Sequence, residues 1–411
     1  MSTSSKSLIG YLLVAIIALG VGVGVGYVAF GGMAPTGPGA QKKTLRAAFI
    51  YIGPIGDIGW TYAHEQGRLY VQNLFNDWLV TNYSESVPEG QSQSYLDNYV
   101  SLGYDIIFTT SFGYMDATYD AAVAYPDTIF FHCSGYKRRA NMGTYFAEFY
   151  QLYYLNGLMA GALTKTGKIG YVAAHLIPEV VRHINAFALG AQEAYSRLHP
   201  GQNITLEIRV LHSWYDPTKA RQAAQDLINW GADALAFTED SPGVIQLAEE
   251  VTEGGKQIYT FAHYSPMLKY GNETVVSGQL VHWGILYQDI LAKVYLGIYN
   301  TTNLENVDYW WMLKEGAVEM GADFGVPINS KFIPELKSMY VDIPDLGHIT
   351  VYNWIMTRLA QMSGENVVFD PFTGPIYANN GTLMVPEGVR LDHDALWSMD
   401  WFVIHVEQPS E

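Results

Sequence analysis

From residue 44 onward, short apolar runs alternate with longer amphipathic runs, and this alternation restricts the possible folds more than any other feature of the sequence. The amphipathic runs predict helices over 61–79, 114–125, 149–164, 178–198, 217–230 and 242–252. The apolar runs have the length of strands and are LRAAFIY (45–51), DIIFTT (105–110), TIFFHC (128–133), KIGYVAA (168–174), ITLEIRVL (204–211), DALAFT (233–238) and QIYTFA (257–262). Strands that alternate with helices form βαβ units and parallel sheets.

There are too many such units for one ordinary sheet. We interpret the segment TKTGK (164–168) as the start of a second series of strands and helices. A chain of 411 residues with 49% hydrophobic content is long enough for two or more packed cores. We therefore expect two α/β domains in series with a cleft between them.

The first forty residues follow a different pattern. The stretch LIGYLLVAIIALGVGVGVGYVAF (8–30) contains no charged side chain and exceeds the roughly 20 apolar residues that span a bilayer. A signal-peptide core is shorter, at roughly 7–15 residues. We expect residues 1–30 to be an uncleaved membrane anchor at the cell membrane, with an extracytoplasmic domain behind it; a long signal peptide is the alternative. Residues 31–43 form a predicted Gly/Pro linker.

Five Asn-X-Ser/Thr triplets lie beyond this span and are candidates for N-glycosylation. Any one such triplet is a weak signal, because it also occurs by chance. Their position beyond the anchor agrees with an extracytoplasmic domain. They are centred on Asn82, Asn203, Asn272, Asn300 and Asn380.

Charge and cysteine content exclude several functions. The formal net charge is −17, which argues against nucleic-acid polymers as partners, because phosphate binding needs clustered Lys and Arg. The single cysteine, Cys133, rules out an intramolecular disulfide and a Cys-based metal cluster, and it follows an apolar run, so we expect an inert, partly buried thiol. The sequence has no HExxH, GxSxG or phosphate-loop motif. We expect neither catalysis nor a cofactor.

The loops that follow the strands collect aromatic and polar side chains. Open α/β sheets bind ligands at the carboxyl ends of their strands, and several rings at that edge indicate a small, flat ligand. In the first loop, YIGPIGDIGWTYAHEQGR (51–68), Trp60 either packs a tight corner or stacks on a ligand. Asp240 and Asp216 are also expected to cap helices. The predicted ligand-binding residues are Asp57, Trp60, Ser111, Phe112, Tyr136, Trp214, Asp240, Tyr264 and Trp283.

A series of motifs in a fixed order resembles the basic membrane protein family, the substrate-binding proteins of ABC importers. The resemblance covers nearly all of residues 45–405. The motifs are GPIGDIGWTYAHEQGR (53–68), FTTSFGYM (108–115), IPEVVRHINAFALGA (177–191), WYDPTK (214–219), DSP (240–242), DPFTGPI (370–376) and SMDWF (398–402).

This resemblance implies a type I periplasmic-binding-protein fold, with two doubly wound α/β domains, a hinge and an interdomain cleft. It implies residues 44–150 with about 283–315 for domain 1, and residues 151–282 with about 316–405 for domain 2. It also implies a purine base or nucleoside as ligand and ABC permease subunits as partners. Characterised relatives sandwich the base between two aromatic rings, at the positions of Trp60 and Trp214.

Two positions depart from the family pattern. A hydrophobic span replaces the usual lipidated cysteine, and HYSP (263–266) replaces a loop whose carboxylate contacts ribose in relatives, with Tyr264 in its place. We therefore expect a free base to bind at least as well as its nucleoside. The alternatives to transport are a ligand-sensing receptor of the same fold and a surface glycoprotein on a former binding fold.

Overall fold

The computed structural model describes residues 44–407. The predicted membrane span and linker lie outside the described residues. Within 44–407, none of the helices combines the length and the apolar character that crossing a bilayer requires.

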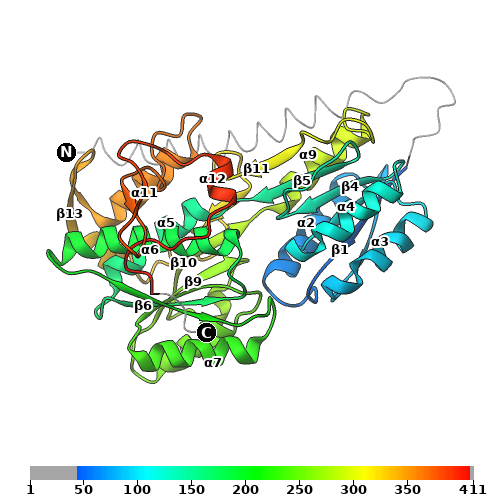
Figure 1. Cartoon of the computed structure of the whole chain (residues 1–411). Coiled ribbons are helices and arrows are strands. Elements are labelled where there is room, and N and C mark those ends of the chain that lie inside the picture. Colours follow the sequence, from blue (N-terminus) through cyan, green and yellow to red (C-terminus); the bar gives the residue numbers. More distant parts are fainter. Residues whose placement is uncertain (1–43, 408–411) are drawn as a thin grey trace, which may run out of the picture. The chain divides into compact units, whose positions relative to one another are not determined.

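The first sheet has six strands in the order β11-β5-β4-β3-β1-β2, and every pairing between neighbours is parallel. Its strands are β1 (Leu45–Ile50), β2 (Leu79–Ser84), β3 (Ile106–Thr109), β4 (Ile129–Cys133), β5 (Met142–Ala147) and β11 (Asp308–Trp311). The helices that accompany it are α2 (Trp60–Leu74), α3 (Ser92–Ser101), α4 (Met115–Ala124) and α9 (Trp283–Tyr295). We call this sheet with its four helices lobe 1; its elements up to β4 are blue to cyan in Figure 1.

The second sheet repeats this arrangement, in the order β12-β10-β9-β8-β6-β7. Its pairings are parallel except for β12, which runs antiparallel to β10. Its strands are β6 (Lys168–Ala173), β7 (Thr205–Val210), β8 (Ala234–Thr238), β9 (Tyr259–Tyr264), β10 (Val275–Val281) and β12 (Val318–Met320). With α5 (Tyr150–Leu163), α6 (Pro178–Leu198), α7 (Pro217–Trp230), α8 (Gly243–Glu253) and α11 (Val351–Ser363) it forms lobe 2.

The chain passes between the lobes three times, after β5, after β10 and after β11. The crossing segments are hydrogen-bonded near their ends. The Glu148 N–H donates to the Trp311 carbonyl at 2.8 Å, and the His282 N–H donates to the Ala317 carbonyl at 2.8 Å. Three connections at one place leave a hinge between the lobes as the natural mode of motion.

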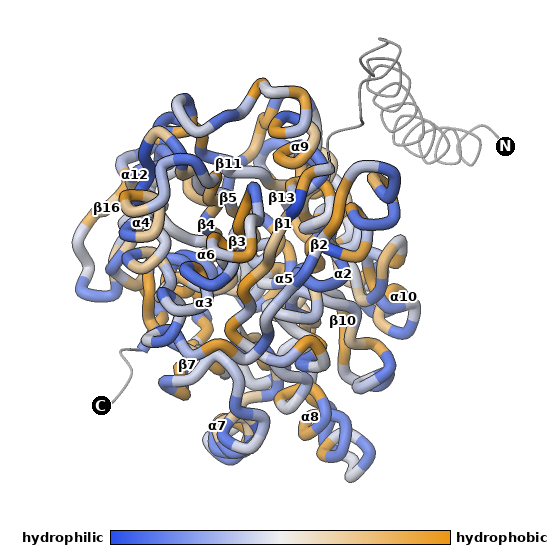
Figure 2. The backbone as a smooth tube through the Cα atoms, turned by 90° about the vertical axis from the view of Figure 1, so that its right-hand side faces the viewer, coloured by the Kyte–Doolittle hydropathy of each residue, from blue (hydrophilic) through white to orange (hydrophobic). Residues whose placement is uncertain are grey.

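The central strands are buried along their whole length because helices cover both faces of a parallel sheet. Every residue of β3, β4, β5 and β8 is buried. In Figure 2, hydrophobic residues are frequent in the chain around β3. Cys133, at the end of β4, is fully buried and free, and burial raises the pKa of its thiol well above the usual value.

Two predicted helices begin and end at the predicted residues, α6 and α7. Each has a proline in its first turn, where the missing N–H costs no hydrogen bond. Asp216 caps α7 as expected, since its carboxylate accepts from the Lys219 N–H at 3.0 Å. The helix predicted over 61–79 is too long, because α2 ends at Leu74 and Leu79 begins β2, paired with Leu45 of β1.

Helices α5 and α6 approach closely enough to require glycine. A Cβ on Gly190 would lie 2.1 Å from the Tyr154 carbonyl oxygen, so no larger residue fits without moving a helix. This packing holds α6 in place, and the first turn of α6 faces the space between the two lobes.

The C-terminal segment packs onto lobe 2 and is orange to red in Figure 1. Asn185 of α6 donates to the Trp401 carbonyl at 2.7 Å and accepts from the Val403 N–H at 2.9 Å. Leu206 of β7 exchanges main-chain hydrogen bonds with His405 and Glu407. The remaining elements are α10 (Ile333–Ser338), β13 (Tyr340–Ile343), β14 (Gly347–Thr350), β15 (Ile376–Tyr377), β16 (Leu383–Val385) and α12 (His393–Trp397).

Candidate ligand-binding site

A small cavity lies where the carboxyl ends of strands from both lobes meet, and we call it the interlobe cavity. Its volume is about 20 Å³, which is room for roughly one water molecule. The residues that line it follow β1, β3 and β4 in lobe 1 and β6, β7 and β8 in lobe 2, except that one is the last residue of β9. They are Ile52, Trp60, Ser111, Phe112, Ser134, Glu179, Trp214, Asp240 and Tyr264.

Trp60 serves both the cavity and the packing beside it. Its indole N–H donates to the Thr110 carbonyl at 2.5 Å, and only 6% of the residue is exposed. Its ring meets those of Tyr264 and Trp283 edge to face, at centroid distances of 5.0 and 5.2 Å. Both interpretations of this tryptophan, packing and ligand contact, are therefore compatible with its position.

Asp57 holds the Trp60 loop in place rather than lining the cavity. Its carboxylate accepts hydrogen bonds from the N–H groups of Gly59, Thr61 and Tyr62 at 2.8–2.9 Å, which satisfies the free donors at the start of α2. Burial raises the pKa of Asp57 to about 6, although these three N–H groups act in the opposite direction.

The loops around the cavity are conformationally strained. Ile58, Ser134, His212 and Tyr264 have φ values of 67°, 65°, 54° and 63°, in the left-handed region. Such values are unusual for residues other than glycine, and for a β-branched or bulky residue they are true outliers. Strained residues persist where the surroundings enforce them, and they cluster at ligand-binding sites.

The two lobes touch directly beside the cavity. Gly59 of lobe 1 lies against the main chain of Asp240 in lobe 2, and a Cβ on Gly59 would come within 2.7 Å of the Asp240 Cα. Ile58 packs onto the apolar cluster of lobe 2 that contains Val244 and Leu280. These contacts close the cavity on the side of the first loop.

Two carboxylic acids line the lobe 2 side of the cavity, and both are buried. Burial raises the pKa of Glu179 from 4.5 to about 7, although Arg182 lowers it. Burial and the nearby charges of Asp57, Glu239 and Glu179 raise the pKa of Asp240 well above its usual value. The cavity therefore holds acids that bind protons unusually tightly.

The expectation that Asp240 caps a helix is wrong, because the hydroxyl of Ser241, and not Asp240, accepts the hydrogen bond from the first N–H of α8, that of Gly243. The N–H and hydroxyl of Ser241 donate to Glu239 at 2.9 and 3.0 Å, and the Ser241 hydroxyl accepts from the Gly243 N–H at 3.1 Å. Within the described chain, the Asp240 carboxyl group makes no hydrogen bond or ion pair, and its N–H donates to the Trp214 carbonyl at 2.9 Å. Its side chain is thus free to contact a ligand.

The structure brings six of the nine predicted ligand-binding residues together around the cavity: Trp60, Ser111, Phe112, Trp214, Asp240 and Tyr264. It places the other three, Asp57, Tyr136 and Trp283, outside the lining. Tyr136 is 53% exposed on lobe 1, whereas Trp283 is 1% exposed and stacks on His64 at a centroid distance of 4.2 Å.

Three lining residues were absent from the prediction: Ile52, Ser134 and Glu179. Ile52 and Ser134 directly follow strand runs that the sequence reveals, so their position in the loops was available as a signal. Glu179 is the second residue of the helix that follows KIGYVAA, inside the motif IPEVVR. Its acidic side chain in the first turn of a helix had the ordinary explanation of complementing the helix dipole.

A larger hollow of about 470 Å³ lies on lobe 2, between α6 and residues 368–376. Its acidic groups are already engaged. The Tyr154 hydroxyl donates to Glu193 and the Tyr150 hydroxyl to Asp370, each at 2.6 Å. This hollow offers fewer free polar groups than the interlobe cavity, which we take as the candidate site.

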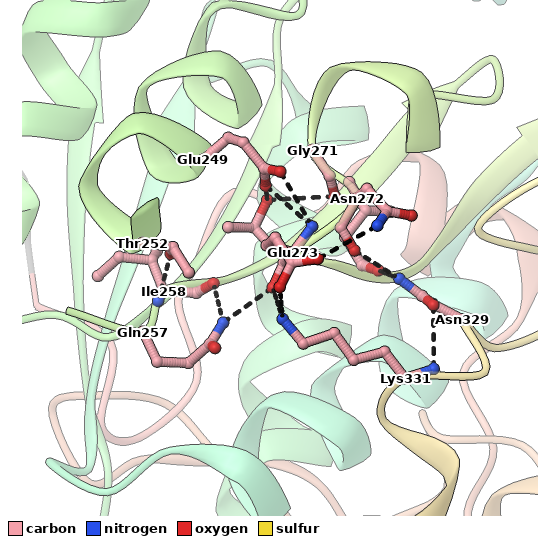
Figure 3. Close-up of polar contacts among 11 residues, drawn as sticks. Glu249, Thr252, Gln257, Ile258, Gly271, Asn272, Glu273, Asn329 and Lys331 are labelled. Atoms are coloured by element: carbon pink, nitrogen blue, oxygen red, sulfur yellow. Dashed lines mark hydrogen bonds and ion pairs between the residues drawn. The ribbon is translucent and has the colours of Figure 1, made fainter. Parts of the chain in front are cut away.

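The side chains of all five candidate glycosylation asparagines are exposed. The triplet at Asn272 differs from the others in its surroundings, which Figure 3 shows. The Thr274 hydroxyl is buried and donates to Glu249 at 3.1 Å, and Asn329 donates to the Asn272 carbonyl at 3.0 Å. Lys331 pairs with Glu273 at 2.5 Å in the same cluster. Glycosylation at these positions stays a prediction.

The sequence profile described as "ABC transporter substrate-binding protein PnrA-like" matches residues 44–342. The chain is 33% identical over 372 residues to a purine-binding protein of Brucella abortus, covering 90% of this chain and 95% of that protein. It is 36% identical over 292 residues to a putative ABC transporter glucose-binding protein of Haloferax volcanii, covering 71% of this chain and 70% of that protein.

A solved structure shares the fold. An ABC transporter solute-binding protein from Aeropyrum pernix superposes with a TM-score of 0.65 at 16% sequence identity, covering 86% of this chain and 95% of that chain. The expected type I periplasmic-binding-protein fold, with two lobes built on parallel sheets, is confirmed.

Proposed function

Because the chain belongs to the PnrA-like family of ABC transporter substrate-binding proteins, which are extracytoplasmic and not catalytic, we propose that it binds a purine base or nucleoside for an ABC importer. The ligand would bind in the interlobe cavity, and permease subunits would receive it. The named relative that binds purines matches this chain over nearly its whole length, which supports this ligand class.

The observation that carries this proposal is the composition of the cavity lining. Trp60, Phe112, Trp214 and Tyr264 offer aromatic faces, and Glu179 and Asp240 offer buried hydrogen-bond acceptors. Base–aromatic stacking contributes about 1–3 kcal/mol per base. A flat ring with N–H donors on its edge matches both kinds of group.

Binding requires the lobes to separate first, since the cavity of about 20 Å³ is far smaller than a nucleobase. Ligand entry then opens the Gly59–Asp240 contact, and closure over the ligand excludes water. The three connections between the lobes allow such a hinge motion.

Glucose is the competing ligand, because a relative named for glucose binding matches 71% of the chain. Vicinal hydroxyl groups can also donate to buried carboxyl groups. A sugar, however, needs acceptors and donors around its whole rim, and four of the nine residues that line the cavity are aromatic. We therefore favour a purine.

The deciding experiment has two parts. Mass spectrometry should detect a purine among the small molecules released when purified protein, residues 44–411, is denatured. Calorimetry should then rank adenine, adenosine, guanosine, AMP and glucose. A free base should bind at least as well as its nucleoside, because bulky Tyr264 stands where relatives place the ribose-binding carboxylate. AMP should bind poorly, because no described lining residue is cationic. Tight binding of glucose without binding of any purine would contradict the proposal.

The cellular setting belongs to the same proposal. Residues 1–30 would anchor the protein in the cell membrane, with residues 44–411 outside the cytoplasm. A gene neighbourhood that encodes a permease and an ATPase would favour transport. Its absence would favour a sensing receptor of the same fold.

A further inference from the structure

Glu179 and Asp240 form an unusual pair at the lobe 2 side of the interlobe cavity. They come from different loops, since Glu179 begins α6 and Asp240 follows β8. They are 7% and 2% exposed, and both line the cavity. They are close enough for the charge of Glu179 to act on Asp240. Among the described residues, the Asp240 carboxyl group has no hydrogen-bond partner, although it lines the cavity. Burying such a group is costly, and a donor on the ligand relieves this cost.

The charged groups around the pair provide no cation to neutralise it. Arg182 is the nearest positive charge to Glu179, but its guanidinium contacts Glu148 at 2.6 and 2.8 Å and donates to the Leu396 carbonyl at 3.2 Å. His183 is bound to Glu148 as well, at 2.9 Å.

Asp240 faces further acids. Asp57 from the first loop of lobe 1 and Glu239 on its own loop both raise its pKa. On lobe 1, the Ser134 hydroxyl hydrogen-bonds to Glu179 and lowers its pKa. Asp240 has no such donor among the described residues, so a ligand must supply the hydrogen that its carboxyl group requires.

We propose that Glu179 and Asp240 select purines that present two adjacent N–H donors, as the N1–H and 2-amino groups of guanine do. This inference rests on the proposed function and names the purine. Two acceptors at one end of the cavity match two donors side by side. Hypoxanthine lacks the 2-amino group and offers one donor there, and adenine places an acceptor, N1, beside its amino group.

A purine whose edge presents the wrong donors and acceptors to the two acids loses binding free energy, because a closed cavity contains no water to replace the missing hydrogen bonds. With adenine, the acceptor nitrogen N1 needs an acid that keeps its proton, so adenine binding should weaken as the pH rises above the raised pKa of Glu179, about 7. With guanine, both acids accept, and the donor edge replaces the water they lose on closure. A site built for a hydrogen-bonding group discriminates strongly against ligands that lack it, because its own buried groups are left unpaired.

The test measures the affinities of guanine, hypoxanthine and adenine, and of their ribosides, by tryptophan fluorescence and calorimetry. The riboside series differs only in the base edge. At pH 8, guanosine should bind the unaltered protein at least tenfold more tightly than inosine, and adenosine should bind most weakly. Losing a hydrogen bond to a charged partner corresponds to about a tenfold to hundredfold change in affinity.

The variants Glu179→Gln and Asp240→Asn assign the preference to the pair. Each should weaken guanosine binding by about tenfold or more, and should reduce the ratio of guanosine to inosine affinity. Glu250→Gln, on the outer surface of α8, is the matched control and should change neither. Removing a buried carboxyl group that makes no ion pair should not unfold the protein, and thermal denaturation checks this.

The outcomes separate the two proposals. If no purine binds to the folded protein, the proposed function fails, and this inference fails with it. If purines bind but guanosine and inosine differ by less than about threefold, only the inference is overturned. It is also overturned if the preference survives in both variants.

Discussion

Gly59 in the first loop of lobe 1 lies directly against the main chain of Asp240 in lobe 2, so closely that any side chain at this position would collide with it. The distance from a Cβ on Gly59 to the Asp240 Cα would be 2.7 Å. Main-chain atoms cannot move aside as the end of a flexible side chain can. The fit between the lobes therefore depends on the absence of a side chain at one residue.

Gly59→Ala should hold the lobes apart and weaken ligand binding. Each lobe keeps its own core, so the melting temperature should change by only a few degrees. Small-angle X-ray scattering with and without ligand should show a smaller contraction for the variant than for the unaltered protein. Gly56→Ala is the control, because it lies in the same loop but has no atom within 4 Å of the position that its new methyl group would take. Unchanged affinity in Gly59→Ala would mean that the contact is absent from the bound form.

The two tryptophans of the cavity should respond differently to truncation. Trp214 is partly exposed and contacts His175, whereas Trp60 is 6% exposed and hydrogen-bonded. Trp214→Ala should reduce purine affinity by about tenfold to a hundredfold with little loss of stability. Trp60→Ala should also lower the free energy of unfolding by about 3–5 kcal/mol. Calorimetric binding and urea denaturation on both variants distinguish these effects, and equal stability losses would contradict the prediction.

The buried ion pair between Glu148 and Arg182 should be a major element of stability at the hinge. Their atoms approach to 2.6 Å, and the Arg182 guanidinium also lies over the rings of Trp310 and Trp397 at 4.9 and 5.3 Å. Burial alone would raise the pKa of Glu148, but Arg182 and His183 outweigh it and lower the pKa to about 2.

Arg182→Met should cost about 3–5 kcal/mol, because it leaves the Glu148 charge buried with only His183 beside it. The double variant with Glu148→Gln should lose much less than the sum of the two single losses. Urea denaturation of the four proteins measures this coupling. Additive losses would show that the pair contributes no mutual stabilisation.

The acids of the cavity should make the protein less stable as the pH rises from about 4.5 to about 7. The pKa of Glu179 is raised from 4.5 to about 7 and that of Asp57 from 3.8 to about 6, so the folded protein binds these protons more tightly than the unfolded chain does. Their stabilisation is complete below the unfolded pKa and is lost as the pH passes the folded one. Glu148 acts in the opposite direction below about pH 4.5, and the buried histidines His64, His132 and His263, whose pKa values are lowered by burial, act in the opposite direction below about pH 6.5.

The size of the Glu179 effect is roughly 3 kcal/mol across this range. Glu179→Gln should therefore remove this declining contribution, so its free energy of unfolding, measured by urea denaturation between pH 4.5 and 7.5, should rise relative to that of the unaltered protein as the pH increases. Glu250→Gln, on the surface, should leave the pH dependence unchanged. The same pH dependence in Glu179→Gln and in the unaltered protein would refute the prediction.

Removal of residues 1–43 should leave a folded protein that no longer sediments with membranes. Residues 45–411 form a compact unit of their own, so their melting temperature should not depend on the preceding segment. Fractionation of cells that express the full chain tests the anchor. Full-length protein in the aqueous fraction, with its N-terminus already cleaved, would support the signal-peptide alternative.

The elements that the sequence predicted well are those with strong local signals. Helix α7 has Asp216 and Pro217 at its start and Gly231 at its end, three residues whose preferences act within one turn. The strand LVTNYS (79–84) was not predicted, because its identity depends on pairing with Leu45–Ile50, which is more than thirty residues away. A strand that depends on a partner so far away in the chain cannot be recognised from the pattern of its neighbouring residues.

The residues of the candidate site also divide into those with a strong local signal and those whose position depends on the fold. Trp60 and Trp214 stand out as large rings in glycine-rich or turn-forming loops. Asp240 and Glu239 are adjacent acids before the same helix, and only the direction of each side chain decides which one accepts from Ser241 and which one faces the cavity. Trp283 follows a strand as the lining residues do, yet it stacks on His64 in the interior. The domain limits near residues 150, 283 and 315 stay a prediction.

Strand β11 completes the edge of the lobe 1 sheet, yet it follows five of the six strands of the lobe 2 sheet in the chain, β6 to β10. A ribosome that adds about 5–20 residues per second needs roughly 10–30 s to proceed from Ala147 to Asp308. During that interval the edge of β5 has no neighbour, and an unpaired edge is open to pairing with another chain. Newly made protein is therefore most exposed to aggregation before Trp311 has emerged, and slower synthesis across lobe 2 lengthens this vulnerable period.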